Sequence, residues 1–142
     1  MNFHYTYYPQ MNLFIQQVEG EWDFEIYFNF IRKIESNVPW NDVRFILSDF
    51  RETLMPKTQK DIDNIPEIYK IREYVKLHNV KHTYLVGNPG VTAFFMMYAK
   101  ENKRKDIKYS FCSTLSRTVR LIEPIKSEEE CFLYLNNLIP VK

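Results

Sequence analysis

The chain has 142 residues, a length that fits one domain whose core needs neither disulfides nor metals. Its composition, 45% hydrophobic and 26% charged, is typical of a globular protein and excludes a disordered chain. The formal net charge of +1 argues against a nonspecific nucleic-acid binder, because such a protein needs a strongly basic face.

The sequence also indicates where the protein works. No apolar run is long enough to span a bilayer, and Met1 to His4 lack the basic start of a signal peptide. We therefore expect a cytoplasmic protein. Cys112 and Cys131 match no metal-ligand spacing, so we expect both to be reduced and buried, and we predict no metal or cofactor.

Periodicity along the chain predicts two strands, then alternating helices and strands, then two final helices. The expected strands are residues 3–8, 13–18, 43–47, 80–86 and 107–111, with Gly20 ending the second. The expected helices are residues 21–36, 58–75 with a break at Pro66, 90–102, 115–122 and 127–139. An opening hairpin followed by βα alternation predicts an α/β fold with a mixed, largely parallel sheet.

Helix starts are marked by capping residues. Asp23 or Glu21 is the expected cap of the first helix, and Ser127 that of the last. The dipeptide Ser113-Thr114 favours a helix over residues 115–122, although residues 118–122 also fit an extra strand. Aromatic residues make up 16% of the chain, which predicts an aromatic-rich core.

The stretch LVGNPGVTAFF, from Leu85 to Phe95, has the look of a phosphate-binding loop. It matches neither the P-loop pattern G-x-x-x-x-G-K-[ST] nor the dinucleotide fingerprint G-x-G-x-x-G. It does fit a helix start, with Asn88 as N-cap and Pro89 in the first turn. The alternative is a weak anion site at Asn88 and Gly90, because an exposed helix N-terminus presents free N–H groups.

A second candidate site is SDFRE, which follows a central strand where ligands bind in open α/β sheets. Asp49 and Arg51 are two residues apart, so they share a face and can hold a polar ligand. Alternatively they pair with each other, and Asp49 accepts backbone N–H groups.

The third candidate is FFMMY, residues 94–98, which has more large apolar side chains than one helix face needs. Phe95, Met96 and Tyr98 are therefore candidates for a partner-binding face, a homodimer face or an apolar pocket. Burial of the whole run in the core is the alternative.

Catalysis finds little support. His4, His78 and His82 fall on separate elements, which argues against a metal site. No Ser/His/Asp or Cys/His arrangement follows from the sequence order, so we predict no catalytic residue and do not expect an enzyme. The basic run at residues 100–105 is interpreted as a solvated helix end.

Four segments carry a family likeness: YTYYPQMNLFIQQVEGEW, FILSDFRE, YLVGNPGVTAFFMMY and YSFCSTLSRTVRLI. Together they resemble the SpoIIAA-like branch of the STAS (sulphate transporter and anti-sigma factor antagonist) superfamily, over most of residues 3–122. The resemblance implies a single α/β domain over residues 1–142, with a four- or five-stranded mixed sheet and helices packed mainly on one face. Residues 127–139 would be an added C-terminal helix.

The resemblance also implies a regulatory role. Members include anti-sigma factor antagonists, which bind a kinase-like partner and are switched by phosphorylation of a serine after the third strand. Carried over by position, that switch falls in residues 51–58, which lack an Asp-Ser-Ser-Gly motif. Thr53 and Thr58 are the hydroxyls there, and they are the candidate phosphorylation sites.

Three functional hypotheses follow. The first is a non-catalytic regulatory or protein-interaction module with an unknown protein partner. The second is a binder of a small apolar or amphipathic, lipid-like ligand between sheet and helices, as in related Sec14-type domains. The third and weakest is an uncharacterised enzyme. A deep apolar pocket with Asp49 and Arg51 at its mouth would favour the ligand, and a packed interior with an exposed apolar patch the partner.

Overall fold

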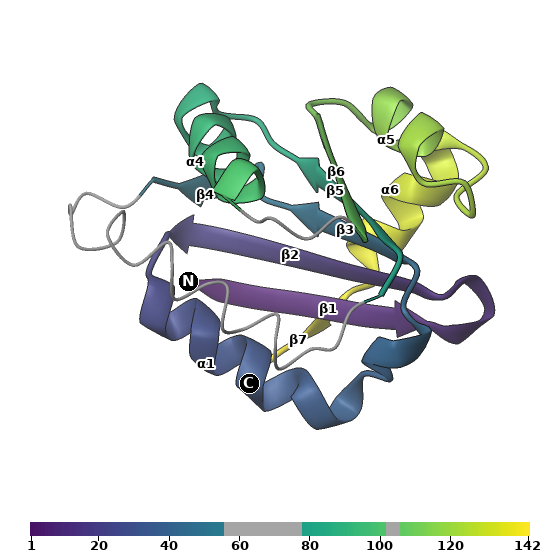
Figure 1. The fold of residues 1–142 in the computed structure, drawn as a ribbon, viewed down its shortest axis with the longest axis horizontal. Coiled ribbons are helices and arrows are strands. Elements are labelled where there is room, and N and C mark those ends of the chain that lie inside the picture. Colours follow the sequence, from purple (N-terminus) through teal and green to yellow (C-terminus); the bar gives the residue numbers. More distant parts are fainter. Residues whose placement is uncertain (56–77, 102–105) are drawn as a thin grey trace.

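A computed structural model describes residues 1–55, 78–101 and 106–142 (Figure 1). The strands are β1 (Asn2–Tyr8), β2 (Leu13–Glu21), β3 (Phe45–Asp49), β4 (Thr53–Leu54), β5 (Val80–Leu85), β6 (Ile107–Cys112) and β7 (Ile139–Pro140). The α-helices are α1 (Phe24–Ile34), α4 (Pro89–Glu101), α5 (Leu115–Leu121) and α6 (Glu128–Asn136). Short 3-10 helices cover Pro9–Met11, Glu35–Asn37 and Trp40–Asp42.

The sheet has the order β6-β5-β3-β2-β1-β7, and β4 pairs with the end of β2. β1 is antiparallel to β2 and β7, whereas β2, β3, β5 and β6 run parallel to one another. The predicted mixed, largely parallel sheet is confirmed. The five expected strands are all present, and the two-residue strands β4 and β7 are additions that the sequence did not reveal.

β2 is longer than the sequence predicted. Gly20 was expected to end it, but the strand continues to Glu21, and Gly20 pairs with Thr53 of β4. Gly20 has φ +93°, a conformation that residues with a Cβ rarely adopt, so glycine lets the strand bend without leaving the ladder. The prediction was wrong because β4, which is distant in sequence, supplies the pairing.

The predicted helix starts are confirmed. The side chains of Asp23, Thr114 and Ser127 each accept a hydrogen bond from a backbone N–H in the first turn of α1, α5 and α6. Residues 115–122, for which a helix and an extra strand were the alternatives, form the helix α5 (Leu115–Leu121). The predicted helix over residues 58–75 lies outside the described residues.

Two hydrophobic clusters lie on opposite faces of the sheet. The larger one packs α1 and α4 against one face and is rich in aromatic rings, as predicted. The smaller one packs α5 and α6 against the other face, where Leu47 and Leu85 point. The described helices therefore divide between the two faces, which differs from the expectation that they gather mainly on one. The reason is that β2, β3 and β5 bury apolar side chains on both faces, and each face needs a cover.

Within the described ranges, every helix is too short or too polar to cross a lipid bilayer.

Candidate functional site

Two of the three candidate segments lie side by side at the carboxyl ends of the parallel strands. The chain after β3 is tied to β5, because Phe50 N donates to Leu85 O at 2.8 Å. The chain after β5 is tied to β6, because Val86 N donates to Cys112 O at 2.9 Å. Gly87 fits closely against the Arg51 backbone, since a Cβ at position 87 would lie 3.4 Å from the Arg51 carbonyl oxygen. The fold thus brings the loops of SDFRE and LVGNPGVTAFF together.

The start of α4 has the predicted cap. Asn88 Oδ1 accepts from Gly90 N at 2.8 Å, and Asn88 O accepts from Thr92 N at 2.9 Å. Pro89 occupies the first helical position, where no intrahelical acceptor exists for an N–H. Because the Asn88 side chain already binds the Gly90 N–H, the alternative of an anion site there loses one of its donors.

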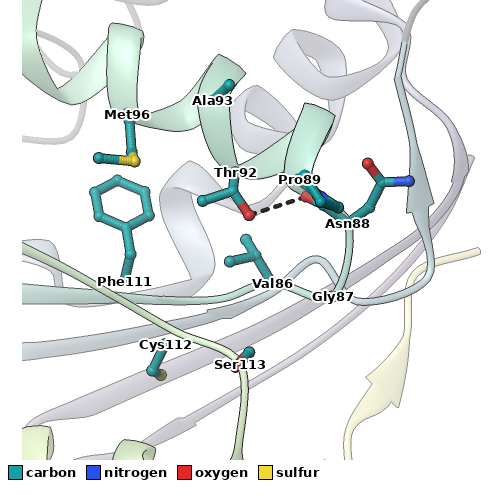
Figure 2. Close-up of a pocket in the computed structure, with 10 residues that line it drawn as sticks. All are labelled: Val86, Gly87, Asn88, Pro89, Thr92, Ala93, Met96, Phe111, Cys112 and Ser113. Carbon is teal, nitrogen blue, oxygen red and sulfur yellow. Dashed lines mark hydrogen bonds between the residues drawn. The ribbon is translucent and has the colours of Figure 1, made fainter.

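A pocket of about 520 Å³ opens between the start of α4 and the end of β6 (Figure 2). Its lining includes Val86, Asn88, Thr92, Met96, Phe111 and Ser113. Met96 is 53% exposed and lies beside the Phe111 ring, a contact that thioethers and aromatic rings favour. We call this the α4–β6 surface.

Phe95 does not belong to that surface. It is 4% exposed, and its ring stacks on that of Phe50 with centroids 4.2 Å apart. Trp22 meets it edge-on at 5.3 Å. The prediction of Phe95 as a partner-binding residue is therefore wrong, because its side chain fills the core under α4. The Tyr98 side chain lies outside the described part of the structure, while Met96 and Met97 are exposed.

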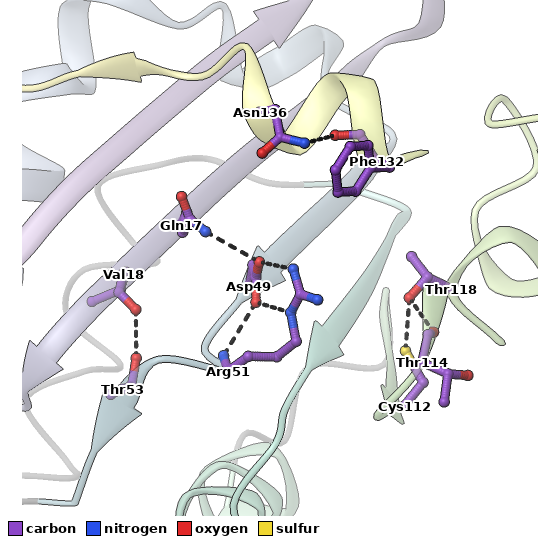
Figure 3. A network of polar contacts seen from close by, with 10 residues as sticks. All are labelled: Gln17, Val18, Asp49, Arg51, Thr53, Cys112, Thr114, Thr118, Phe132 and Asn136. Carbon is purple, nitrogen blue, oxygen red and sulfur yellow. Dashed lines mark hydrogen bonds and ion pairs between the residues drawn. The ribbon is translucent and has the colours of Figure 1, made fainter. Parts of the chain in front are cut away.

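Asp49 and Arg51 pair with each other (Figure 3). Asp49 Oδ1 accepts from Arg51 N at 3.1 Å and Nε at 2.9 Å, and Oδ2 accepts from Nη2 at 2.7 Å. Gln17 Nε2 adds a contact of 3.4 Å to Oδ2. The hydrogen bonds that Arg51 donates to Asp49 raise the Arg51 pKa, although burial acts in the opposite direction. Asp49 is 1% exposed, so its carboxylate oxygens accept hydrogen bonds inside the protein and do not face a ligand.

Thr53 is not accessible to a kinase. Its hydroxyl is buried, and it donates to Val18 O at 2.7 Å, holding β4 against β2 (Figure 3). Burial contradicts the prediction of Thr53 as a phosphorylation site, because the hydroxyl must reach solvent to be modified. Thr58 lies outside the described residues.

The sequence missed a buried Ser–His contact. Ser48 Oγ lies 2.8 Å from His82 Nε2 and accepts from Gln16 Nε2 at 2.7 Å. This spacing resembles that of a nucleophile and its base, but Ser48 is 0% and His82 5% exposed. The contact therefore stabilises the core rather than presenting a nucleophile. No sequence signal pointed to it, because the two residues meet only through the register of β3 and β5.

The other histidines do not form a site. The buried Nδ1 of His4 finds no hydrogen-bond partner among the described residues, and His78 Nδ1 lies 3.8 Å from an Asp106 carboxylate oxygen. In the part of the chain that the structure describes, no group of three His, Cys, Asp or Glu side chains is placed to hold a metal ion.

Both cysteines are buried thiols on the α6 side of the sheet. Cys112 Sγ lies 3.2 Å from Thr118 Oγ1 (Figure 3). Burial raises the pKa of Cys112, and it raises the pKa of Cys131 to about 11. A thiol with a raised pKa is a poor nucleophile at neutral pH, because the thiolate is the reactive form.

Comparisons with protein-family models and with curated proteins find no match to this chain. Among solved structures, the chain is similar to the anti-sigma factor antagonist SpoIIAA in its unphosphorylated form. The TM-score is 0.52 at 13% sequence identity, and the match covers 87% of this chain and 99% of that one. At this identity the likeness shows the fold alone: the chain has an α/β fold like that of SpoIIAA, as the sequence predicted.

Proposed function

We propose that this protein is a non-catalytic, regulatory protein-interaction module that binds its partner at the α4–β6 surface. The observation that carries the proposal is Met96, a large apolar side chain that is 53% exposed above an open pocket. Exposed apolar groups grouped around a pocket are typical of protein-binding sites, and methionine adapts to varied partners.

The packed interior supports a protein partner over a ligand held between sheet and helices. On the α4 side, stacked rings occupy that space. The ring centroid of Tyr84 lies 5.0 Å from that of Phe111 and 5.2 Å from that of Phe95. Asp49 and Arg51 bind each other and do not offer a polar group at a pocket mouth. A small ligand needs a site that covers most of its surface, and the ring contacts of Tyr84, Phe95 and Phe50 occupy the space between α4 and the sheet where these residues lie.

The chemistry of the described residues supports the non-catalytic part of the proposal. Ser48 and His82 are buried, and Asp49 accepts four hydrogen bonds from Arg51 and Gln17. A nucleophile or general base must reach its substrate, so none of these groups is placed to act on one.

A small apolar ligand is the second candidate. The α4–β6 pocket, at about 520 Å³, has a volume in the range of roughly 300–1,000 Å³ that is usual for ligand sites. It is an open surface pocket, however, so a ligand there would keep much of its area in water. We therefore place the protein partner first.

The regulatory part of the proposal rests on analogy of fold. The similar structure is that of an anti-sigma factor antagonist, SpoIIAA, in its unphosphorylated form. One fold hosts many functions, so the analogy suggests a class of role and not a partner. With Thr53 buried, Thr58 remains the proposed phosphorylation site.

Native mass spectrometry of protein taken directly from its source cells tests the proposal. We expect a complex with a second, different polypeptide. We also expect the native and the denatured chain to have the same mass, which means that no small molecule is retained. A stoichiometric small molecule would favour the second candidate instead. A species free of both partner and ligand would contradict both, and a complex of two identical chains would replace the partner by a homodimer.

A further inference from the structure

The sheet has an open side at β6. β6 is the last strand in the order β6-β5-β3-β2-β1-β7, and in the described ranges no strand pairs with its outer side. Six residues long and free of proline, it lacks the features that natural proteins use to block an edge, apart from one charge at Lys108. Such an edge is a template for an added strand.

The direction of the backbone groups in β6 follows from two hydrogen bonds. The carbonyl groups of Asp106 and Cys112 face β5, because they accept from Val80 N and Val86 N at 2.9 Å each. Backbone groups of alternate residues in a strand face opposite sides. The N–H and C=O groups of Ile107 and Phe111, at odd positions between these two, therefore face outward.

The surroundings of this edge are basic. β6 lies between α4 and α5 (Figure 1). Lys108 is exposed on β6 itself, and Arg117 is exposed on α5. Burial raises the pKa of the Cys112 thiol at the end of β6, and the nearby charge of Arg117 acts against that rise. Among the described residues neither cation has an acidic partner, whereas Lys81 pairs with Glu123 and Asp106 lies beside His78. A partner strand at this edge thus meets uncompensated positive charge.

The pocket of the α4–β6 surface lies beside the same edge. Phe111 belongs both to the outward-facing positions of β6 and to the pocket, and Met96 lies next to its ring (Figure 2). Side chains of neighbouring strands at one level of a sheet lie about 5 Å apart. A strand added beside Phe111 would therefore bring one of its own side chains to the pocket.

We propose that the outer edge of β6 binds an extended, acidic segment of the partner protein as an additional strand, with one apolar side chain of that segment in the α4–β6 pocket. The inference rests on the proposed function and names the chemistry of its partner. Main-chain hydrogen bonds to Ile107 and Phe111 give affinity, the pocket selects an apolar side chain, and the cations select acidic flanks.

A peptide of known composition tests this. The probe is a capped ten-residue peptide in which glutamate alternates with valine, and the charge control has lysine in place of glutamate. Two further versions carry N-methyl groups, one on the valine amides and the other on the glutamate amides. Because these amides face opposite sides of an extended peptide, each version loses its hydrogen-bond donors along one edge. Binding is followed by amide hydrogen exchange in nuclear magnetic resonance spectra of the whole chain.

We expect the glutamate peptide to slow exchange at Ile107 and Phe111 by about tenfold or more, because those amides gain acceptors. Amides of Lys108 and Ser110, which face β5, should change little. One N-methylated version should bind on the order of 100-fold more weakly than the other, since it loses several hydrogen bonds at once. The double variant Lys108→Glu/Arg117→Glu should weaken binding about fivefold or more, and Lys142→Glu, the distant control, should not.

Several results would overturn the inference. They are equal binding of the lysine peptide, equal binding of both N-methylated versions, binding that leaves Ile107 and Phe111 unprotected, and no binding up to about 5 mM peptide. Protection of these amides by a second copy of the chain, without peptide, would assign the edge to a homodimer instead. If the peptides fail while a natural partner is still lost on Met96→Asp, this inference alone fails and the proposed function stands.

Discussion

Truncation of two neighbouring residues of α4 should destabilise the protein to very different extents. Phe95→Ala removes a ring that is 4% exposed and stacks on Phe50 at 4.2 Å, so the surrounding core is left with a cavity. Such a change costs about 3–5 kcal/mol, through lost burial, lost ring contacts and incomplete collapse. Met96→Ala removes a side chain that is already 53% exposed, and it should cost less than about 1 kcal/mol.

The pair is measured by chemical denaturation, with thermal unfolding as a check. A loss of about 4 kcal/mol in a domain of this size lowers the unfolding midpoint by roughly 10–16 °C, and Met96→Ala should shift it by about 4 °C at most. Alanine favours helices, so backbone propensity cannot account for the loss in Phe95→Ala. The reasoning is refuted if Phe95→Ala costs under about 1 kcal/mol, or if Met96→Ala costs more than Phe95→Ala.

Three further predictions concern the cap, the ion pair and the thiols. Asn88→Ala should lose about 1 kcal/mol in denaturant unfolding, because the Gly90 N–H loses its acceptor, whereas Asn88→Asp should keep it; equal loss in both would contradict the cap. Asp49→Asn should cost about 1–3 kcal/mol, less than a fully buried pair, because Arg51 is 37% exposed and can turn to water; an unchanged midpoint would argue against the pairing. Near pH 8 the native chain should resist a thiol reagent, because burial raises the pKa of both cysteines, Cys131 to about 11, and both should react after unfolding; rapid labelling of native protein would contradict this.

Local chemistry explains what the sequence could predict. Caps such as Asn88 and Thr114 act on backbone groups two or three residues away, so their effect is written in short segments of sequence. The strands are recognisable because apolar and β-branched residues gather in them. The SpoIIAA-like fold follows from the order of these elements together with the preference for right-handed crossovers.

Tertiary contacts explain what the sequence could not predict. Periodicity shows that residues 94–98 have surplus apolar bulk, but which of Phe95 and Met96 faces the sheet depends on how α4 is rotated. Gly20 predicts the end of a strand, and only its pairing with β4 explains why the strand continues. The pairing of Asp49 with Arg51 was one of two open alternatives, because a two-residue spacing allows contact without requiring it.

The sequence predicted only part of the α4–β6 surface. The loop before α4 and Met96 were singled out from the sequence, whereas Phe111 and Ser113 were not. These residues join the pocket because β6 pairs with β5 in a register that sets its carboxyl end beside the start of α4. That β6 is the outer strand of the sheet is also a property of topology, which the sequence of one strand does not encode.

The most direct test of the central claim is the affinity of a natural partner for variants of the α4–β6 surface. A photo-crosslinking amino acid at position 96 captures the partner in its source cells, and the purified partner is titrated against Met96→Asp and against Leu133→Asp. Leu133 is a matched control, since it is 52% exposed and lies on α6, on the opposite face of the sheet. We predict a rise in the dissociation constant of about 30-fold or more for Met96→Asp, as for an apolar hot spot, and little change for Leu133→Asp. An equal or larger effect of Leu133→Asp would contradict the assignment of the α4–β6 surface.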